Sequence, residues 1–453
     1  MAYISEITIE GLNYEFDVHL PFNGPHCIIV GPNGVGKSTA LQIIAYALGR
    51  KWDLLAEQRF KAISISWGNE TARLERKSCT KKEGPKYLYK LERQLRSQGV
   101  LAEFLNADLS PSASYDRFSH LGMSRSFLQK AQDWMNSAGI PSANVRELSA
   151  FSDKLDEKDV PRCSFLPTSR RIEVELSKIS GSMPSYLAES FSSYFEERTT
   201  DNYFEEVVRF GMEDIERIIG DFEQRTQWET RNKFNFMMAN LLKEMANKKT
   251  ISVKELRKRD LSAKEVKRVL SRIEEGVLSP SEREKIISTV TSMSAPKKGG
   301  GHPEFHKKWL SHFFVRLQEV DGDLQNTEKP MINFVETIKK YLPPKEVRYD
   351  IEKSKFSIQS PSGDDIKLSE LSSGEKQLTS ILAMLEFADG KSNILIDEPE
   401  LSLSVPWQSS VLTDIVNTLG CNQLIAVTHS PFVFDNSLSS SVLDFSECIN
   451  IHG

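Results

Sequence analysis

The sequence GPNGVGKST, residues 31–39, constrains the fold more than any other part of the chain. It matches the pattern G-x-x-x-x-G-K-[ST] through Gly31, Gly36, Lys37 and Ser38. The apolar run HCIIV before it is typical of a buried strand, and the residues after it have helical apolar spacing. A glycine-rich turn between a strand and a helix exposes backbone N–H groups at the positive end of the helix. This segment is therefore predicted to bind phosphate.

Several residues of this loop have an expected role toward a bound nucleotide. Lys37 is expected to reach the β- and γ-phosphates of ATP, and Ser38 is expected to ligate Mg²⁺. The other residues predicted to contact the nucleotide are Asn33, Gly34, Gly36 and Thr39. The alternative is a chance match in a glycine-rich turn. The strand signal before the motif and the helix signal after it favour the phosphate site.

Acidic residues and a histidine stand at the ends of two further apolar segments. NILID ends in Asp397 and is followed by Glu398, while QLIAVT is followed by His429. An acid at the tip of a strand beside a phosphate loop can hold Mg²⁺, which is the role predicted for Asp397. Glu398 can then polarise the water that attacks the γ-phosphate, and His429 is predicted to contact that phosphate. Without the phosphate loop, a solvated loop and a structural histidine would explain the same residues.

Composition restricts the class of protein. The 453 residues are 39% hydrophobic and 27% charged, with a formal net charge of −5, so the chain as a whole lacks the positive charge of a nucleic-acid-binding protein. The sequence contains neither an apolar run of membrane-spanning length nor a signal-peptide pattern. Its five cysteines show no C-x-x-C spacing, which indicates reduced thiols and a cytoplasmic location. His302 and His306 lack a third ligand for a metal site.

The order of predicted elements indicates an α/β nucleotide-binding sheet interrupted by a helical domain. Residues 1–180 are expected to form an N-terminal lobe with the phosphate loop and a small antiparallel sheet. Residues 181–345 are expected to form a helical insertion of about 160 residues, with helices within 202–224 and 253–275. Residues 346–453 are expected to complete the sheet as a C-terminal lobe.

A second anion-binding pattern, LSSGEKQ, lies far from the first, at residues 371–377. Ser372 and Glu375 have the S-x-x-E spacing of a capping box, so a well-capped helix is the simple interpretation. The doubled serine and Gly374, however, would expose backbone donors at a positive helix end. Because the phosphate loop already serves the nucleotide of its own chain, Ser372 and Gly374 are predicted to contact the γ-phosphate of ATP bound by another copy.

These motifs together resemble the set found in ABC-type ATPases. GPNGVGKST, LSSGEKQ, NILIDEPE and THS occur in the order of the phosphate loop, signature, Walker B and switch histidine of that class. The resemblance implies an ATPase head with ATP and Mg²⁺ as cofactors. It also implies slow hydrolysis in composite sites, formed when two heads in a dimer or a higher homo-oligomer enclose the nucleotides.

The SMC, RecF and OLD-like branch of this class is the most similar, because DEPE followed by LSLS resembles its Walker B and D-loop. Two positions depart from that branch. Ser404 stands where members often have histidine. No glutamine matches the Q-loop, and its nearest counterpart is FLPTSRR, so Arg170 or Arg171 would sense the phosphates instead. A pair of surface arginines is the alternative.

The resemblance also implies a role for the hydrolysis. The insertion is too short for the long coiled coils of SMC and Rad50-like proteins, and residues 430–453 are too few for the Toprim domain of OLD nucleases. A compact head of this kind resembles the ATPase subunits of bacterial anti-phage systems, PARIS-like first and Septu-like second. In such systems the ATPase holds or controls a separate nuclease or toxin effector, and a phage-encoded protein can be the trigger.

A RecF- or Rad50-like repair clamp that binds duplex DNA is the competing interpretation. It needs a basic groove, for which KELRKRDLSAKEVKR, residues 254–268, is a candidate. The same pattern is also typical of a solvated helix face. A transporter motor is not expected, because the DEPE branch is soluble, so no membrane partner is predicted.

Overall fold

The computed structural model describes residues 3–79, 142–157, 160–167, 204–206, 212–247, 262–273, 276–294 and 305–451, with nine further residues between 95 and 133. The described chain divides into two compact units. The first contains residues up to 209 together with 390–417 and 421–453. The second contains residues 210–389 and 418–420. The phosphate loop, Asp397, Glu398 and His429 therefore belong to the first unit, whereas Ser372 and Gly374 belong to the second.

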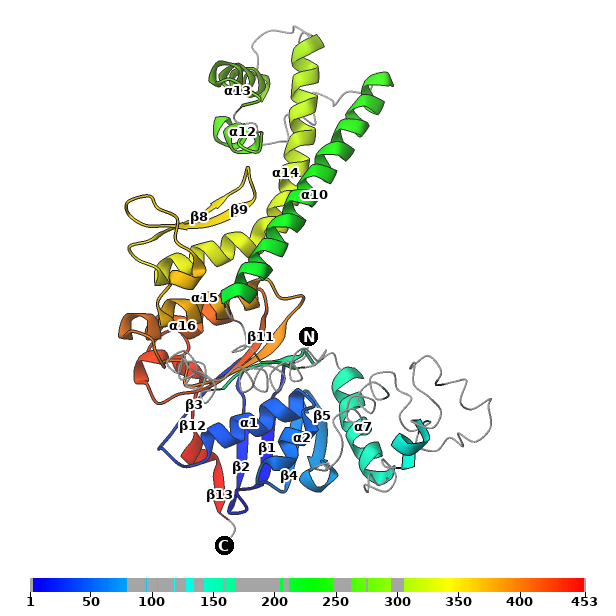
Figure 1. The fold of residues 1–453 in the computed structure, drawn as a ribbon, viewed down its shortest axis with the longest axis vertical. Helices are drawn as coiled ribbons and strands as arrows, with labels where there is room; N and C mark the ends of the chain where they lie inside the picture. Colours follow the sequence, from blue (N-terminus) through cyan, green and yellow to red (C-terminus); the bar gives the residue numbers. More distant parts are fainter. Residues whose placement is uncertain are drawn as a thin grey trace. The chain divides into compact units, whose positions relative to one another are not determined.

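A six-stranded parallel sheet forms the centre of the first unit (Figure 1). Its strands, in spatial order, are β12 (Val442–Asp444), β3 (His26–Val30), β11 (Cys421–Val427), β10 (Ser392–Asp397), β6 (Cys163–Leu166) and β7 (Phe204–Glu206). Every residue of β10 and β11 is buried, which explains why their apolar parts, residues 394–396 and 424–427, are continuous rather than alternating. The phosphate loop therefore follows a strand that is the immediate neighbour of β11.

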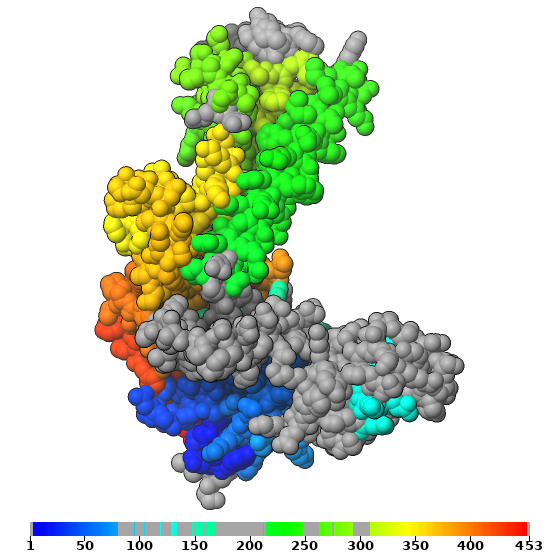
Figure 2. Space-filling model, in the orientation of Figure 1, coloured from blue at the N-terminus to red at the C-terminus, as the bar shows by residue number. Residues whose placement is uncertain are grey.

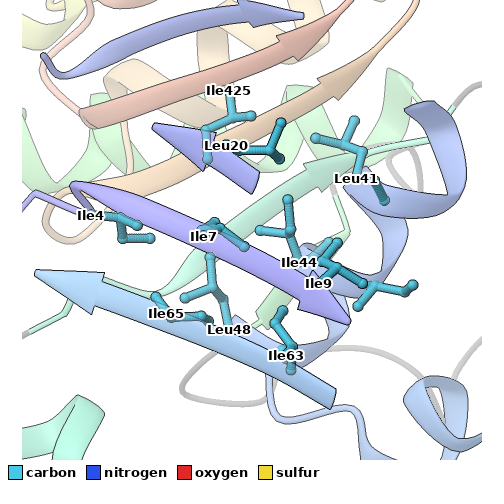
Figure 3. Close-up of a cluster of buried hydrophobic side chains, with 14 of the residues drawn as sticks. Ile4, Ile7, Ile9, Leu20, Leu41, Ile44, Leu48, Ile63, Ile65 and Ile425 are labelled. Atoms are coloured by element: carbon cyan, nitrogen blue, oxygen red, sulfur yellow. The ribbon is translucent and has the colours of Figure 1, made fainter. Parts of the chain in front are cut away.

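A five-stranded antiparallel sheet lies beside this core. Its strands are β13 (Ile449–Ile451), β2 (Phe16–Pro21), β1 (Glu6–Leu12), β4 (Ala62–Trp67) and β5 (Glu70–Glu75). Helix α1 (Lys37–Leu48) packs the apolar side chains Leu41, Ile44 and Leu48 against Ile7 and Ile9 of β1 and Ile63 and Ile65 of β4 (Figure 3). Burying each of these side chains stabilises the fold by about 1.5–3 kcal/mol. This core therefore fixes the start of α1, and with it the phosphate loop.

Two expectations for the first unit need correction or qualification. Helical spacing predicts a helix within residues 202–224, but Phe204–Glu206 form β7, which pairs in parallel with the edge of β6. Periodicity cannot anticipate this pairing, because the sheet edge that it satisfies is made of residues distant in the chain. The segment KYLYKLERQL, residues 86–95, also has a strand-like pattern; residues 86–94 lie outside the described residues, and Leu95 is buried. The other helices of this unit are α2 (Trp52–Glu57), α7 (Ser142–Glu157) and α16 (Val405–Val416).

Long helices dominate the second unit. They are α10 (Met212–Ala246), α12 (Ala263–Leu270), α13 (Pro280–Ser294), α14 (Phe305–Ile338) and α15 (Ser373–Glu386). Helix α14 packs against α10, α13 and α15. Figure 2 shows α10 in green along the surface of this unit, where Trp228, Phe236, Met238 and Leu242 are exposed.

A two-stranded hairpin, β8 (Glu346–Asp350) and β9 (Lys355–Gln359), precedes α15. A turn at SPSGDD, residues 360–365, follows it, where Gly363 N–H donates to Ser360 O. Short 3-10 turns complete the chain at Arg76–Ser78, Lys339–Tyr341, Leu368–Glu370, Pro431–Val433, Ser439–Ser441 and Phe445–Cys448.

The five cysteines, Cys27, Cys79, Cys163, Cys421 and Cys448, are buried and form no disulfide. Within the described part of the chain, no helix has both the length and the apolar character needed to cross a membrane.

Candidate nucleotide-binding site

The phosphate loop joins β3 to α1 through a backbone that only glycine adopts readily. Gly34 and Gly36 have φ values of 82° and 95°. A Cβ atom on Gly36 would also lie 3.1 Å from Cδ2 of Leu12, a contact too close for the packed β1 strand to accept easily. Asn33 and Gly34 are exposed, and Thr39 is half-buried in the first turn of α1. The loop thus presents its backbone to solvent while its helix end is fixed in the core.

Lys37 is nearly buried, and its ammonium group lies on the loop itself. Nζ donates hydrogen bonds to Gly31 O at 2.9 Å and to Pro32 O at 2.7 Å. Burial lowers the pKa of Lys37, although the nearby Glu398 and Asp397 carboxylates favour its charged form. Phosphate oxygens would replace the two carbonyls as stronger, charged acceptors.

Ser38 and Asp397 come together from opposite ends of the sequence. The Ser38 hydroxyl donates to Oδ1 of Asp397 at 3.0 Å, and Asp397 is buried at the end of β10. A hydroxyl and a carboxylate are hard oxygen ligands that suit Mg²⁺, which binds proteins through one or two such groups and completes its shell with phosphate and water. Among the described residues, no group of three His, Cys, Asp or Glu could hold a metal ion.

Glu398 and His429 are neighbours at the same sheet edge. His429 Nε2 lies 3.3 Å from Glu398 Oε1, and the Glu398 backbone has a left-handed φ of 52°. Such a φ is uncommon outside glycine and is held here by the bond from Glu398 N–H to Val427 O. Burial raises the pKa of Glu398 to about 8, helped by a hydrogen bond and charge from Glu400 and by the charge of Asp397.

Glu400 is a residue that the sequence interpretation missed. Its Oε1 accepts the N–H groups of His429 at 3.0 Å and Ser430 at 3.1 Å, and its Oε2 accepts the Thr428 hydroxyl at 2.8 Å. Burial favours its neutral form, but these bonds and one with Glu398 hold its pKa below the usual range. The third acid of DEPE was the available signal. It could not show that the side chain turns toward the next strand.

The signature segment has the predicted helix start. Ser372 and Glu375 form the capping box, in which Ser372 N–H donates to Glu375 Oε2 at 2.8 Å. Ser372 is exposed and Gly374 is buried. The sequence interpretation also missed Lys345, whose Nζ lies 2.5 Å from Oε1 of Glu375. Arg170 and Arg171 lie outside the described residues.

The fold and these contacts agree with a comparison against protein families. Residues 27–435 match the family described as "AAA domain, putative AbiEii toxin, Type IV TA system". The chain belongs to this family. It is therefore a member of an AAA-type ATPase family. The match extends from the strand before the phosphate loop to the segment after the switch histidine.

Individual relatives are more distant. The chain is 24% identical over 185 residues to "Retron Vc95 probable ATPase" of Vibrio cholerae serotype O1 biovar El Tor. That alignment covers 38% of this chain and 33% of the relative, so the chain spans about a third of the curated relative that it matches.

Solved structures give weak likenesses. An Smc head domain with an extended coiled coil from Pyrococcus furiosus, bound to the C-terminal domain of ScpA, has a TM-score of 0.32 and 14% identity, covering 96% of this chain and 91% of that chain. An Smc head domain with a coiled coil and joint from Pyrococcus yayanosii has a TM-score of 0.31 and 13% identity, covering 96% and 93%.

Proposed function

We propose that this chain is a Mg²⁺-dependent ATPase subunit of a bacterial anti-phage defence system, PARIS-like or Septu-like, that controls a separate nuclease or toxin effector. The ATPase activity in this proposal is supported by side chains that follow neighbouring strands at the same end of the parallel sheet. These are Lys37, the Ser38–Asp397 pair and the Glu398–His429 pair. The toxin in the family description and the retron in the relative's name support a defence role. Slow turnover suits a subunit that senses and holds rather than one that works as a motor.

The residues of the first unit divide the chemistry among them. Lys37 leaves the loop carbonyls to bind the β- and γ-phosphates, and the loop N–H groups bind the remaining phosphate oxygens. Ser38 and Asp397 would hold Mg²⁺, which would neutralise charge on the phosphates. Glu398 takes a proton from the attacking water, and His429 donates a hydrogen bond to the γ-phosphate.

The signature segment supplies a second part of the proposal, which is that Ser372 and Gly374 complete the ATP site of another copy. Ser372 is exposed at the N-terminus of a 14-residue helix, where the helix dipole attracts anions. The capping box satisfies the N–H of Ser372 itself, so donors deeper in the first turn remain for a phosphate. Two copies would then form a head-to-head dimer or a higher homo-oligomer.

Mixing two defective chains tests the composite site. A Ser372→Arg chain keeps its phosphate loop, so it should bind ATP but not hydrolyse it as a homodimer. A Lys37→Ala chain should bind no ATP by calorimetry but keep its signature. In a mixed dimer, one site combines the intact phosphate loop of the Ser372→Arg chain with the intact signature segment of the Lys37→Ala chain. If the two sites act independently, each mixed dimer should recover up to about half of the parent activity. A fully active Ser372→Arg homodimer would show that the segment is only a capped helix.

The effector and its trigger call for a separate experiment. The product of the neighbouring gene should co-purify with this chain, with a mass that changes between ATP-bound and ATP-free samples. The purified chain alone should cleave neither DNA nor RNA. ATPase activity stimulated by duplex DNA, without any co-purifying protein, would favour the repair-clamp interpretation instead.

A further inference from the structure

The Glu400 carboxylate connects two chain segments that both follow strands of the parallel sheet. Glu400 lies three residues beyond the end of β10, and its partners Thr428, His429 and Ser430 follow β11 directly. The network continues through Ser430, whose N–H donates to the Thr428 hydroxyl at 3.0 Å and whose own hydroxyl donates to Gln408 Oε1 at 2.7 Å. One side chain therefore fixes the path of the backbone where it leaves β11.

The residue held in this way is the one that faces Glu398. The imidazole of His429 is 37% exposed and lies 3.3 Å from Glu398 Oε1, so its position depends on that contact and on the backbone that carries it. Glu400 also forms a side-chain hydrogen bond with Glu398, so a single carboxyl group contacts both members of the Glu398–His429 pair.

We propose that Glu400 is a positioning residue for ATP hydrolysis, which holds the His429 backbone against the end of β10 and so sets the imidazole relative to Glu398. This inference rests on the proposed hydrolytic role of Glu398 and His429. In this proposal Glu400 acts through His429 rather than by contacting the nucleotide. Its loss should therefore lower kcat and leave the KM for ATP nearly unchanged, because the phosphate loop that binds ATP is intact.

Two substitutions separate geometry from charge. Glu400→Ala removes all of the acceptors, whereas Glu400→Gln keeps one oxygen that can accept both backbone N–H groups. We expect kcat to fall about 30-fold in Glu400→Ala and about threefold in Glu400→Gln, with KM for ATP within about twofold of the parent in both. Equal losses in the two variants would show that charge matters rather than positioning, and would overturn the proposal.

Asp350 provides the matched control. Its Oδ1 accepts two backbone N–H groups, from Glu352 at 2.9 Å and Lys353 at 3.1 Å, in the turn after β8. Asp350→Ala removes the same kind of contact from the second unit and should leave kcat unchanged. A loss of kcat in this control similar to that in Glu400→Ala would mean that general loosening of the chain explains both.

A double-mutant cycle tests whether Glu400 acts through His429. If Glu400 acts through His429, Glu400→Ala should lower kcat by less than about threefold in a His429→Ala chain, because that chain has no imidazole left to position. The full loss in that background would overturn the proposal.

Amide hydrogen exchange tests the contact without any ATP. The His429 and Ser430 amides should exchange at least about tenfold faster in Glu400→Ala, while the amides within β11 stay protected. Unchanged exchange at both amides, or faster exchange with unchanged kcat, would overturn the proposal. If the parent chain hydrolyses no ATP, or His429→Ala is fully active, the proposed function itself fails, and the exchange result still shows whether Glu400 holds this backbone.

Discussion

The ammonium group of Lys345 lies 2.5 Å from Oε1 of Glu375, and Oε2 of the same carboxylate accepts the N–H of Ser372 at 2.8 Å. Burial favours the neutral form of Glu375, but the Lys345 bond and the capping bonds hold its pKa below the usual range. Both side chains are largely buried, so this ion pair is less screened by solvent than a surface pair. The start of α15 is therefore fixed by a residue that stands before β8 in the chain.

This relationship predicts an effect confined to the chain that donates the signature. Lys345→Met leaves Glu375 buried without its cation, so the turn at Ser372 should shift. In mixed dimers, adding Lys345→Met to the Lys37→Ala chain should lower the recovered activity about fivefold to tenfold. Adding it to the Ser372→Arg chain should change nothing, because that signature is unused. Lys353→Met, at an exposed lysine, is the control, and equal losses in both placements would contradict the prediction.

Glu398→Gln should separate ATP binding from hydrolysis. The amide keeps the size of the side chain but cannot accept a proton from water, so turnover should fall at least about 100-fold. Calorimetry should show ATP binding in the presence of Mg²⁺ close to that of the parent, since Lys37, Ser38 and Asp397 are unchanged. Near-normal turnover would mean that another group activates the water.

Glu386 predicts a dependence of stability on pH. Burial at the end of α15 raises its pKa to about 7 from an ordinary 4.5, although the Leu419 N–H, Asn333 and Lys329 favour ionisation. Folding thus favours the protonated acid, so this stabilisation is full below about pH 4.5, falls as pH rises toward 7, and is lost above it.

Glu386→Gln should remove the loss of stability that Glu386 causes at high pH. The thermal midpoint of the full chain should rise by roughly 2–8 °C at pH 8 and much less at pH 5. Glu336→Gln, at an exposed position of α14, is the matched control and should show no such difference between the two pH values. A gain for Glu386→Gln that is equal at both pH values would contradict the linkage.

A buried ion network in the second unit predicts a large loss of stability. Arg272 donates to Asp321 Oδ1 at 2.5 Å and to both carboxylate oxygens of Glu328 at 2.9 and 2.7 Å, and all three side chains are at most 4% exposed. Arg272→Met leaves two buried carboxylates short of their cation, which should cost about 3–5 kcal/mol.

Denaturant unfolding of the full chain measures this cost. Arg348→Met breaks an exposed pair with Glu346 and should change the free energy of unfolding by less than about 1 kcal/mol. Similar effects in the two variants would mean that the buried network contributes no more than a surface pair.

The sequence by itself determined the local parts of this protein. The glycine pattern before Lys37, the buried runs of β3, β10 and β11, and the Ser372–Glu375 capping box all depend on residues within a few positions of one another. Their periodicity, turn chemistry and helix caps are therefore visible in one dimension. Family motifs in a fixed order added the expectation that Ser38, Asp397, Glu398 and His429 would meet.

Only the tertiary structure decided which side chains position those motifs. Glu400 reaches the backbone after β11, Lys345 reaches the start of α15, and Phe204–Glu206 become a strand instead of a helix. Each outcome depends on a partner 29 or more residues away, and hydrogen bonds and charges act through space without regard to separation along the chain. Burial, which shifts the pKa values of Glu386 and Glu398, is likewise a property of the packed chain rather than of any local pattern.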